Sequence, residues 1–401
     1  MTTTAVVFDP FSQDFFTDPY ETYGRMRDEA PVYYSPEYDF YALTRHQDVA
    51  AAFKDHETYS SAYGVDLAQV RKGEVTKHGG IIAMDPPAHR RMRSLLNKVF
   101  TPRAIEARRD LVTSTIDRVL SQVDADGFDF VQDFSALFPV EVMTIMQGVP
   151  EPERQQIRLW IDDLLHRDPG QVEMGEGGLK SAIDMSVYYY QLIKARRDDL
   201  GDDLLSKLIT SEIEREDGEM TPLNNLEITE FALLLGGAGA ETVTKLLGNA
   251  AVVFWRNPDQ WQKLLDDPGK VPLAVEELLR YEAPAQYNVR RSMREVTLHG
   301  VTIPAGKPVF LVGGSANRDP RDWTDPDAFD IDRDRAQAQN LGFGYGIHSC
   351  LGAALARMES VVALQKMLEF MPRYEVDWDG CRRVNMQNVA GWSNVPVRVL
   401  R

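Results

Sequence analysis

Residues 343–352 read Phe-Gly-Tyr-Gly-Ile-His-Ser-Cys-Leu-Gly, and this stretch decides how the rest of the chain is interpreted. Glycines at 344 and 346 precede Cys350 and a third follows at 352, a spacing that predicts a tight loop able to approach a flat ligand closely. A long helix is predicted from Cys350 to Met371. A cysteine at the start of a helix is placed where the helix dipole and the free amides favour the thiolate, which is the form that binds metals.

The same pattern also fits a glycine-rich turn in front of a helix with a cysteine buried as a small apolar side chain. The chain has two cysteines, Cys350 and Cys381, and no CxxC pair, which argues against a structural zinc site. Cys381 carries no motif and keeps the apolar interpretation.

Composition excludes several classes of protein. The chain has 401 residues with 44 basic and 61 acidic side chains, a net charge of −17 that argues against nucleic acid as a partner. The longest uncharged apolar stretch, residues 231–240, is far shorter than the ~20 residues of a membrane helix. No signal peptide is evident at the N-terminus. We therefore expect a soluble, cytoplasmic protein without a membrane span.

The periodicity of the chain predicts a mainly α protein with small β-sheets (α+β), folded as a single domain over residues 1–401. Helices are expected at 20–30, after 85–87, and through most of 101–267, with a mobile segment at 166–184 and an irregular one at 60–84. Strands are expected at 31–35, 40–44, 296–298, 301–303 and 309–312.

Three further segments carry polar residues in informative positions. Residues 231–244 read FALLLGGAGAETVT inside an apolar helical pattern, so Glu241 and Thr242 interrupt a core helix. In a purely structural role, the Thr242 hydroxyl would bond to the carbonyl of Ala238 and bend the helix. His89 and Arg93 lie four residues apart on one helical face.

Glu277 and Arg280 are three residues apart and lie on one face of another predicted helix. Taken alone, they would be an ordinary surface ion pair. The coil that follows contains Arg333, and Arg290 precedes the predicted strands.

Taken in their order, these segments resemble the cytochrome P-450 family along nearly the whole chain. The family's heme loop matches residues 343–352, its oxygen-activation motif matches Ala238 to Thr242, and its E-x-x-R pair with a later arginine matches Glu277, Arg280 and Arg333. The resemblance implies the cytochrome P-450 fold, a triangular helical prism with heme between a long central helix and the helix that follows the cysteine loop.

The resemblance also implies the residues that act. Heme b would be held by an axial thiolate from Cys350, the metal ligand, in a loop to which Phe343 and Gly344 contribute. His89, Arg93, Arg290 and His348 would bind the heme propionates. Glu241 and Thr242 would be the catalytic pair that delivers protons to bound dioxygen.

The implied activity is hydroxylation of a hydrophobic small molecule (a terpenoid, a steroid, a fatty-acid-like molecule or another natural product) with dioxygen. Because no flavin or nicotinamide segment is evident, electrons would come from a ferredoxin and a ferredoxin reductase, steered by basic residues near Cys350. We expect a monomer. The alternatives are a peroxygenase driven by hydrogen peroxide on the same fold, and a non-catalytic heme- or lipid-binding protein.

Overall fold

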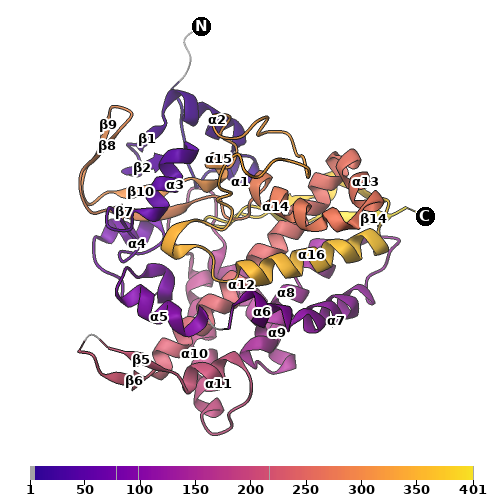
Figure 1. The fold of residues 1–401 in the computed structure, drawn as a ribbon, viewed down its shortest axis with the longest axis horizontal. Helices are drawn as coiled ribbons and strands as arrows, with labels where there is room; N and C mark the ends of the chain where they lie inside the picture. Colours follow the sequence, from indigo (N-terminus) through magenta and orange to yellow (C-terminus); the bar gives the residue numbers. More distant parts are fainter. Residues whose placement is uncertain (1–4, 78, 98, 216, 401) are drawn as a thin grey trace.

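Residues 5–77, 79–97, 99–215 and 217–400 are described by the computed structural model in Figure 1. Helices fill the lower and right-hand parts of that view, and the main sheet lies at the upper left beside the N-terminal helices. The predicted fold class, mainly helical with small sheets, is confirmed. Within the described residues, no helix combines the length and the apolar character that crossing a membrane requires.

The main sheet has five strands in the order β1 (Val32–Ser35), β2 (Phe40–Leu43), β10 (Pro308–Leu311), β7 (Asn288–Ser292) and β3 (Tyr59–Ser60). β1 and β2 form the predicted antiparallel hairpin, and β10 lies parallel to β2 on its other side. Aromatic side chains cover one face of the sheet, where the rings of Phe40 and Phe310 are 4.3 Å apart. This packing fixes β7, the strand that carries Arg290.

The core of the helical part is α12 (Asn225–Arg256), which contains the apolar stretch of residues 231–244 that was predicted to be helical. It begins at a capping box, in which the Asn224 side chain accepts from the amides of Leu226 and Glu227 while the Glu227 carboxylate accepts from the Asn224 amide. Most of its side chains are buried on every side, as its apolar pattern predicts. Neighbouring helices that pack on it are α8 (Phe138–Gln147), α9 (Arg154–Leu165), α10 (Glu176–Arg196) and α16 (Ala353–Phe370).

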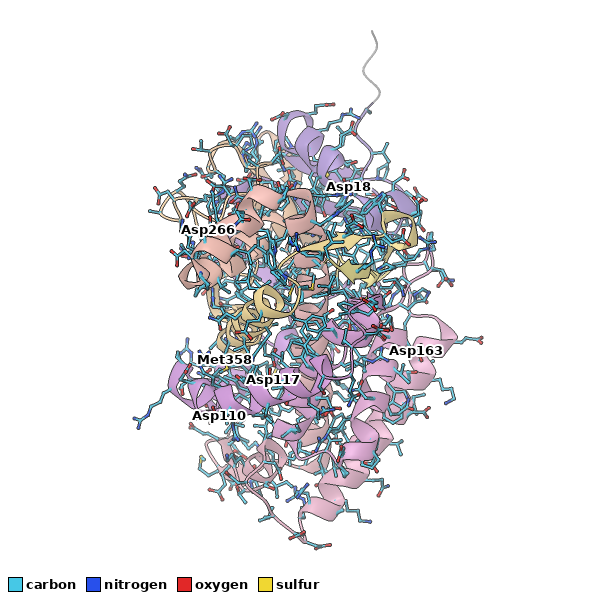
Figure 2. The ribbon with its side chains drawn as sticks, turned by 90° about the vertical axis from the view of Figure 1, so that its right-hand side faces the viewer. Asp18, Asp110, Asp117, Asp163, Asp266 and Met358 are labelled. Carbon is cyan, nitrogen blue, oxygen red and sulfur yellow. The ribbon has the colours of Figure 1, made fainter. Side chains whose placement is uncertain are left out.

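The other helices surround this core. They are α1 (Gln13–Thr17), α2 (Tyr20–Glu29), α3 (His46–Lys54), α4 (Leu67–Lys72), α5 (Ala88–Asn97), α6 (Pro102–Glu106), α7 (Arg109–Leu120), α11 (Leu204–Ile209), α13 (Pro258–Asp266), α14 (Val271–Tyr281) and α15 (Gly313–Ala316). Figure 2 labels Met358 on α16 and Asp117 on α7 close to one another, and an ion pair of 2.9 Å from Lys366 to Asp117 joins the same helices.

The remaining strands are short. They pair as β8 (Val296–Leu298) with β9 (Val301–Ile303), β5 (Glu212–Glu214) with β6 (Met220–Pro222), β12 (Arg382–Arg383) with β13 (Trp392–Asn394), and β14 (Pro396–Val399) with both β11 (Tyr374–Val376) and β4 (Phe128–Asp129). The strands predicted at 296–298, 301–303 and 309–312 are thereby confirmed, the last as β10.

Two local expectations need correction. Besides helices and the turns between them, the span 101–267 contains β4 and the β5–β6 hairpin, whose polar residues gave no strand pattern. The segment 60–84, expected to be irregular, contains α4 and a 3-10 turn at Gly80–Ala83. The segment 166–184 enters α10 at Glu176, and its mobility remains a prediction. There Gly178 permits close packing, since a Cβ at that position would lie 2.8 Å from the carbonyl oxygen of Asp163.

The predicted E-x-x-R arrangement is present and buried. Arg280 is 2% exposed and its Nη2 lies 2.8 Å from Oε1 of Glu277, while the Arg333 Nε reaches the same Oε1 at 3.0 Å. Arg280 also donates to the carbonyl oxygens of Asn317 and Pro326. The network joins α14 to the coil that leads to the cysteine loop. Each of its buried charges has a partner, so none is left uncompensated.

Candidate active site

The cysteine loop has the tight conformation that its glycines predict. Gly344 and Gly346 have φ angles of +66° and +73°, in the left-handed region that favours glycine. A Cβ on Gly346 would stand 2.5 Å from the carbonyl oxygen of Phe53, so a larger residue does not fit there. The loop closes through a hydrogen bond of 2.9 Å from the Cys350 amide to the carbonyl of Phe343. These constraints fix the backbone on both sides of the sulfur.

Cys350 lies just before α16, which begins at Ala353 with Gly352 as its N-cap residue. The Gly352 amide donates to the thiol sulfur, and this bond and the charges of Arg93 and Arg357 act to lower the pKa of Cys350. Burial opposes them and has the largest effect, so that the pKa of the Cys350 thiol is raised overall. Yet Cys350 ranks as exposed by its accessible surface. A side chain that lies deep in the molecule and faces an internal space has both properties.

Arg93 ties α5 to this loop. Its guanidinium donates to the carbonyl oxygen of Ser349 at 2.6 Å and to that of Ile347 at 3.2 Å. His89 stands one turn earlier on α5, and its ring centroid is 4.4 Å from the ring centroid of His348, which belongs to the loop. The predicted residues of α5 and of the loop therefore come together.

Arg290 reaches the same group from β7. It is 6% exposed, and its charge, together with burial, helps to hold the pKa of His348 far below the ordinary value for histidine. Burial also lowers the pKa of Arg290 itself to about 10, and burial with the charge of Arg93 lowers the pKa of His89 to about 4. Both imidazoles are thus neutral near pH 7, and the positive charge of the group comes from the two arginines.

This group of four donors fits the carboxylates of a heme. The Nε2 atoms of His89 and His348 are buried with no hydrogen-bond partner among the described residues. Buried polar atoms are normally paired, so such atoms point to a ligand that accepts hydrogen bonds. Arg290 is aligned by its own backbone neighbour, with Nη1 donating to the Val289 carbonyl at 2.9 Å. Two arginines and two imidazole donors suit the two propionates that a heme carries.

The predicted pair on α12 is arranged as follows. The Thr242 hydroxyl donates to the carbonyl oxygen of Ala238 at 3.0 Å, as expected for its structural role. With its proton used in this way, the hydroxyl oxygen is left to accept a hydrogen bond. Ala238 is exposed and Thr242 is half-buried within a helix whose other faces are packed, so this face of α12 borders open space. The predicted bend remains a prediction.

Glu241 is held by two residues that the sequence analysis missed. The Lys245 Nζ lies 2.6 Å from Oε1 of Glu241, and both side chains are almost fully buried. Asp162 of α9 is hydrogen-bonded to the same carboxyl group. The i, i+4 spacing of Glu241 and Lys245 was a signal for their pairing. No sequence signal could have found Asp162, because it reaches Glu241 only through the packing of α9 on α12.

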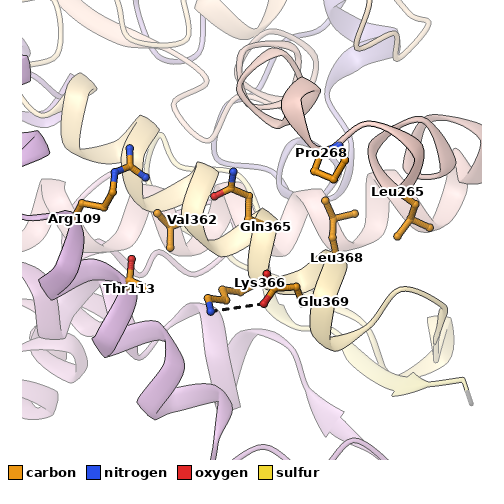
Figure 3. A pocket seen from close by; sticks show the side chains of 9 residues that line it. All are labelled: Arg109, Thr113, Leu265, Pro268, Val362, Gln365, Lys366, Leu368 and Glu369. Atoms are coloured by element: carbon orange, nitrogen blue, oxygen red, sulfur yellow. Dashed lines mark ion pairs between the residues drawn. The ribbon is translucent and has the colours of Figure 1, made fainter.

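A groove of about 500 Å³ lies elsewhere, on the outer side of α16 (Figure 3). Arg109 and Thr113 of α7, Lys366 of α16 and Pro268 form parts of its wall. It contains no residue of the loop, of the imidazole and arginine group, or of the α12 pair, and so it is not the candidate active site.

Comparisons with known proteins agree with this geometry. The family model "Cytochrome P450" matches residues 271–387. Cytochrome P450 130 of Mycobacterium tuberculosis is 36% identical, over 92% of each chain. A mutant of P450 EryK, solved in complex with erythromycin B, is 33% identical with a TM-score of 0.86, over 96% of each chain. CYP109E1 from Bacillus megaterium, solved in complex with testosterone, is 28% identical with a TM-score of 0.87, over 97% of this chain and 100% of its own.

Members of this family bind heme b through a cysteine thiolate and act on a small molecule with dioxygen. The relatives cover almost the whole chain at substantial identity, and their fold is the one described above. The chain therefore belongs to the cytochrome P-450 family and is a heme-dependent monooxygenase.

Proposed function

We propose that residues 1–401 form one heme domain that hydroxylates a hydrophobic natural product, terpenoid, steroid or fatty-acid-like molecule in the cytoplasm, with electrons from a separate ferredoxin and its reductase. Overall, the substrate gains one oxygen atom of dioxygen, and two electrons and two protons convert the other to water. The observation that carries the assignment of the site is the group formed by the buried His89 and Arg290 with the half-buried Arg93 and His348, beside Cys350.

The proposed roles follow from these contacts. Cys350 would supply the thiolate that binds the heme iron, with its sulfur held by the rigid loop and by the Gly352 amide. Phe343 and Gly344 shape the loop beneath the cofactor. Arg93 and Arg290 would neutralise the propionates, and the unpartnered Nε2 atoms of His89 and His348 would donate hydrogen bonds to them. The bound heme supplies the activation of dioxygen, while the protein supplies orientation and protons.

Glu241 and Thr242 are the proposed proton-delivering pair. Thr242 presents a hydroxyl oxygen whose own proton is engaged by Ala238, so a donor can bind to it. Glu241 is the adjacent acid, and it has a cation and a second carboxyl beside it. To deliver protons repeatedly, Glu241 must itself be reprotonated. The neighbouring Lys245 and Asp162 side chains are the groups nearest to it that carry exchangeable protons.

The substrate class is supported by two observations. The neighbours EryK and CYP109E1 were solved with erythromycin B and testosterone, both of them organic small molecules. The exposed Ala238 gives the open face of α12 a small apolar side chain. Such a surface suits a lipophilic molecule better than a charged one.

The proposed electron donor is an acidic ferredoxin that docks near the cysteine loop. Arg357 of α16 supports this choice, because its side chain is 46% exposed and its guanidinium, although paired with Glu276, lies 4.7 Å from the centre of the Phe343 ring. An exposed cation beside the heme ligand's loop would steer an acidic protein despite the net charge of −17.

The test is turnover of testosterone with three supplies: NADPH with a plant-type ferredoxin and its reductase, hydrogen peroxide alone, and neither. Hydroxylated product with the first supply, falling as ionic strength rises, supports the proposal. Efficient turnover with peroxide alone would instead make the protein a peroxygenase. Heme binding without product from any of a panel of steroids, terpenoids and macrolides would leave a binding protein.

A further inference from the structure

The carboxyl group of Glu241 lies in a small cluster of charged side chains where two helices cross. A Cβ on Gly237, one turn before Glu241 on α12, would stand 4.0 Å from Cγ1 of Ile161, which marks where α9 passes over α12. Asp162 follows Ile161 and is hydrogen-bonded to Glu241. Behind Glu241, the stem of Lys245 is packed so closely that a Cβ on Gly391 would lie 2.6 Å from the Lys245 Cβ. The cluster is therefore built into the core, and its members cannot easily part.

Two features distinguish Asp162 from the other members. Its side chain is 34% exposed, whereas those of Glu241 and Lys245 are 4% and 5% exposed, so Asp162 lies between the buried pair and solvent. It also accepts a hydrogen bond of 3.1 Å from the Nη1 of Arg158, one turn earlier on α9. The groups that face Asp162 are therefore Arg158 from its own helix and Glu241 with Lys245 from α12.

Two carboxyl groups can share a hydrogen bond only when one of them carries a proton. The Lys245 ammonium, 2.6 Å from Glu241, favours the charged form of that residue, which leaves Asp162 as the holder of the proton. In agreement with this arrangement, burial and the charge of Glu241 raise the pKa of Asp162 to about 7, although Lys245 and Arg158 act in the opposite direction.

We propose that Asp162 is a positioning residue that takes protons from solvent and passes them to Glu241 for the oxygen-activating pair. The inference rests on the proposed role of Glu241 and Thr242. In each transfer the O–H bond of Asp162 breaks as an O–H bond forms on Glu241, and the Asp162 carboxylate then takes a proton from water at its exposed side. No electrons change hands. Since monooxygenation consumes two protons, the transfer occurs twice per dioxygen.

The test compares Asp162→Asn with Asp163→Asn in the heme-loaded protein. Asp163 is the matched control, because it is the next acid on α9 but accepts from Ser181 of α10 at 2.9 Å and does not face α12. The first readout is the infrared band of a protonated carboxyl group, followed from pH 5 to pH 9. Burial raises the pKa of Glu359 well above its ordinary value, so this residue should contribute a band in all three proteins. A second band, which titrates near neutral pH, should be present in the wild type and in Asp163→Asn and be absent from Asp162→Asn.

The second readout is NADPH-dependent oxygen consumption with testosterone and a plant-type ferredoxin and reductase, in water and in heavy water. Asp162→Asn should lower the rate at least ~10-fold and increase the solvent isotope effect, because a general acid contributes about 10²-fold or more. Its ferric form should bind testosterone as tightly as the wild type, and Asp162→Glu should recover most of the rate.

Persistence in Asp162→Asn of the carboxyl band that titrates near neutral pH, or equal losses of rate in Asp162→Asn and Asp163→Asn, would overturn the inference. The proposed function fails separately: a wild type that loads heme and yields no product with any electron supply refutes it, while the infrared result still decides the protonation of Asp162. A rate loss with an unchanged isotope effect would show that Asp162 merely supports the packing of α9.

Discussion

The Lys245 ammonium lies 2.6 Å from the Glu241 carboxylate, one turn along α12, and neither side chain reaches solvent. An ion pair at this spacing on a helix surface is worth a few tenths of a kcal/mol. A buried pair differs, because removal of one partner leaves the other charge without solvation. Lys245 therefore keeps a charged acid stable inside the molecule, which is a condition for the use of that acid in proton delivery.

Replacement of Lys245 by Met should destabilise the protein by about 3–5 kcal/mol in urea unfolding, because Glu241 would be left buried and unpaired. Lys180→Met is the matched control. Lys180 also forms an i, i+4 pair, with Asp184, but its side chain is 77% exposed, so its loss should change the stability by less than about 0.5 kcal/mol. Equal effects of the two variants would contradict the account of the buried pair.

Asp162 predicts a dependence of stability on pH. Its pKa is raised to about 7 in the folded protein, above the ordinary carboxyl value near 3.8. Between these values the folded state binds a proton that the unfolded state has lost, so wild-type stability should fall as pH rises from about 4 to about 7. Asp162→Asn lacks this loss and should gain stability relative to wild type from pH 5 to pH 8. A difference that stays constant in urea unfolding at both pH values refutes the shift.

Thr242 predicts a specific defect. Thr242→Ala should keep heme and substrate binding but divert reducing equivalents to hydrogen peroxide, with product per NADPH falling several-fold, since general acid catalysis is lost. Thr242→Ser retains the hydroxyl and should recover most of the coupling. Unchanged coupling in Thr242→Ala would mean that protons arrive by another route.

Arg290 should contribute to heme retention. It lies buried on β7 with no acidic side chain bonded to it in the described part of the chain, so its charge is available for a propionate. Arg290→Gln removes that charge, and heme should dissociate about 10-fold faster to apomyoglobin, because a charge-assisted bond is worth roughly 1.5–3 kcal/mol. Arg294→Gln is the control, since Arg294 is 67% exposed and pairs with Asp55 at the surface. Equal rates of heme loss would remove Arg290 from the proposed site.

The parts of the fold that local sequence encodes were predictable. The glycines around Cys350, the i, i+3 spacing of Glu277 and Arg280, and the apolar pattern of α12 each constrain the backbone near the residues concerned. The β5–β6 hairpin was missed because residues such as Glu212 and Pro222 have low strand propensity, and only their pairing makes them strands.

The candidate site divides in the same way. The resemblance placed His89, Arg93, Arg290 and His348 in one site, and the structure brings them together. The neutrality of the two imidazoles was not predictable, since it depends on burial and on nearby arginines from other segments. Asp162 lies 79 residues before Glu241, and no pattern within α9 distinguishes it from Asp163. Such partners are set by tertiary packing alone.

The central claim is that Cys350 supplies a thiolate to the heme iron. The most direct measurement is the absorption spectrum of the dithionite-reduced protein under carbon monoxide, for the wild type, Cys350→Ser and the control Cys381→Ser. We predict the strongly red-shifted Soret band of thiolate-ligated heme for the wild type and for Cys381→Ser, and its loss in Cys350→Ser. The same red-shifted band in Cys350→Ser, or its absence from the heme-loaded wild type, would contradict the assignment.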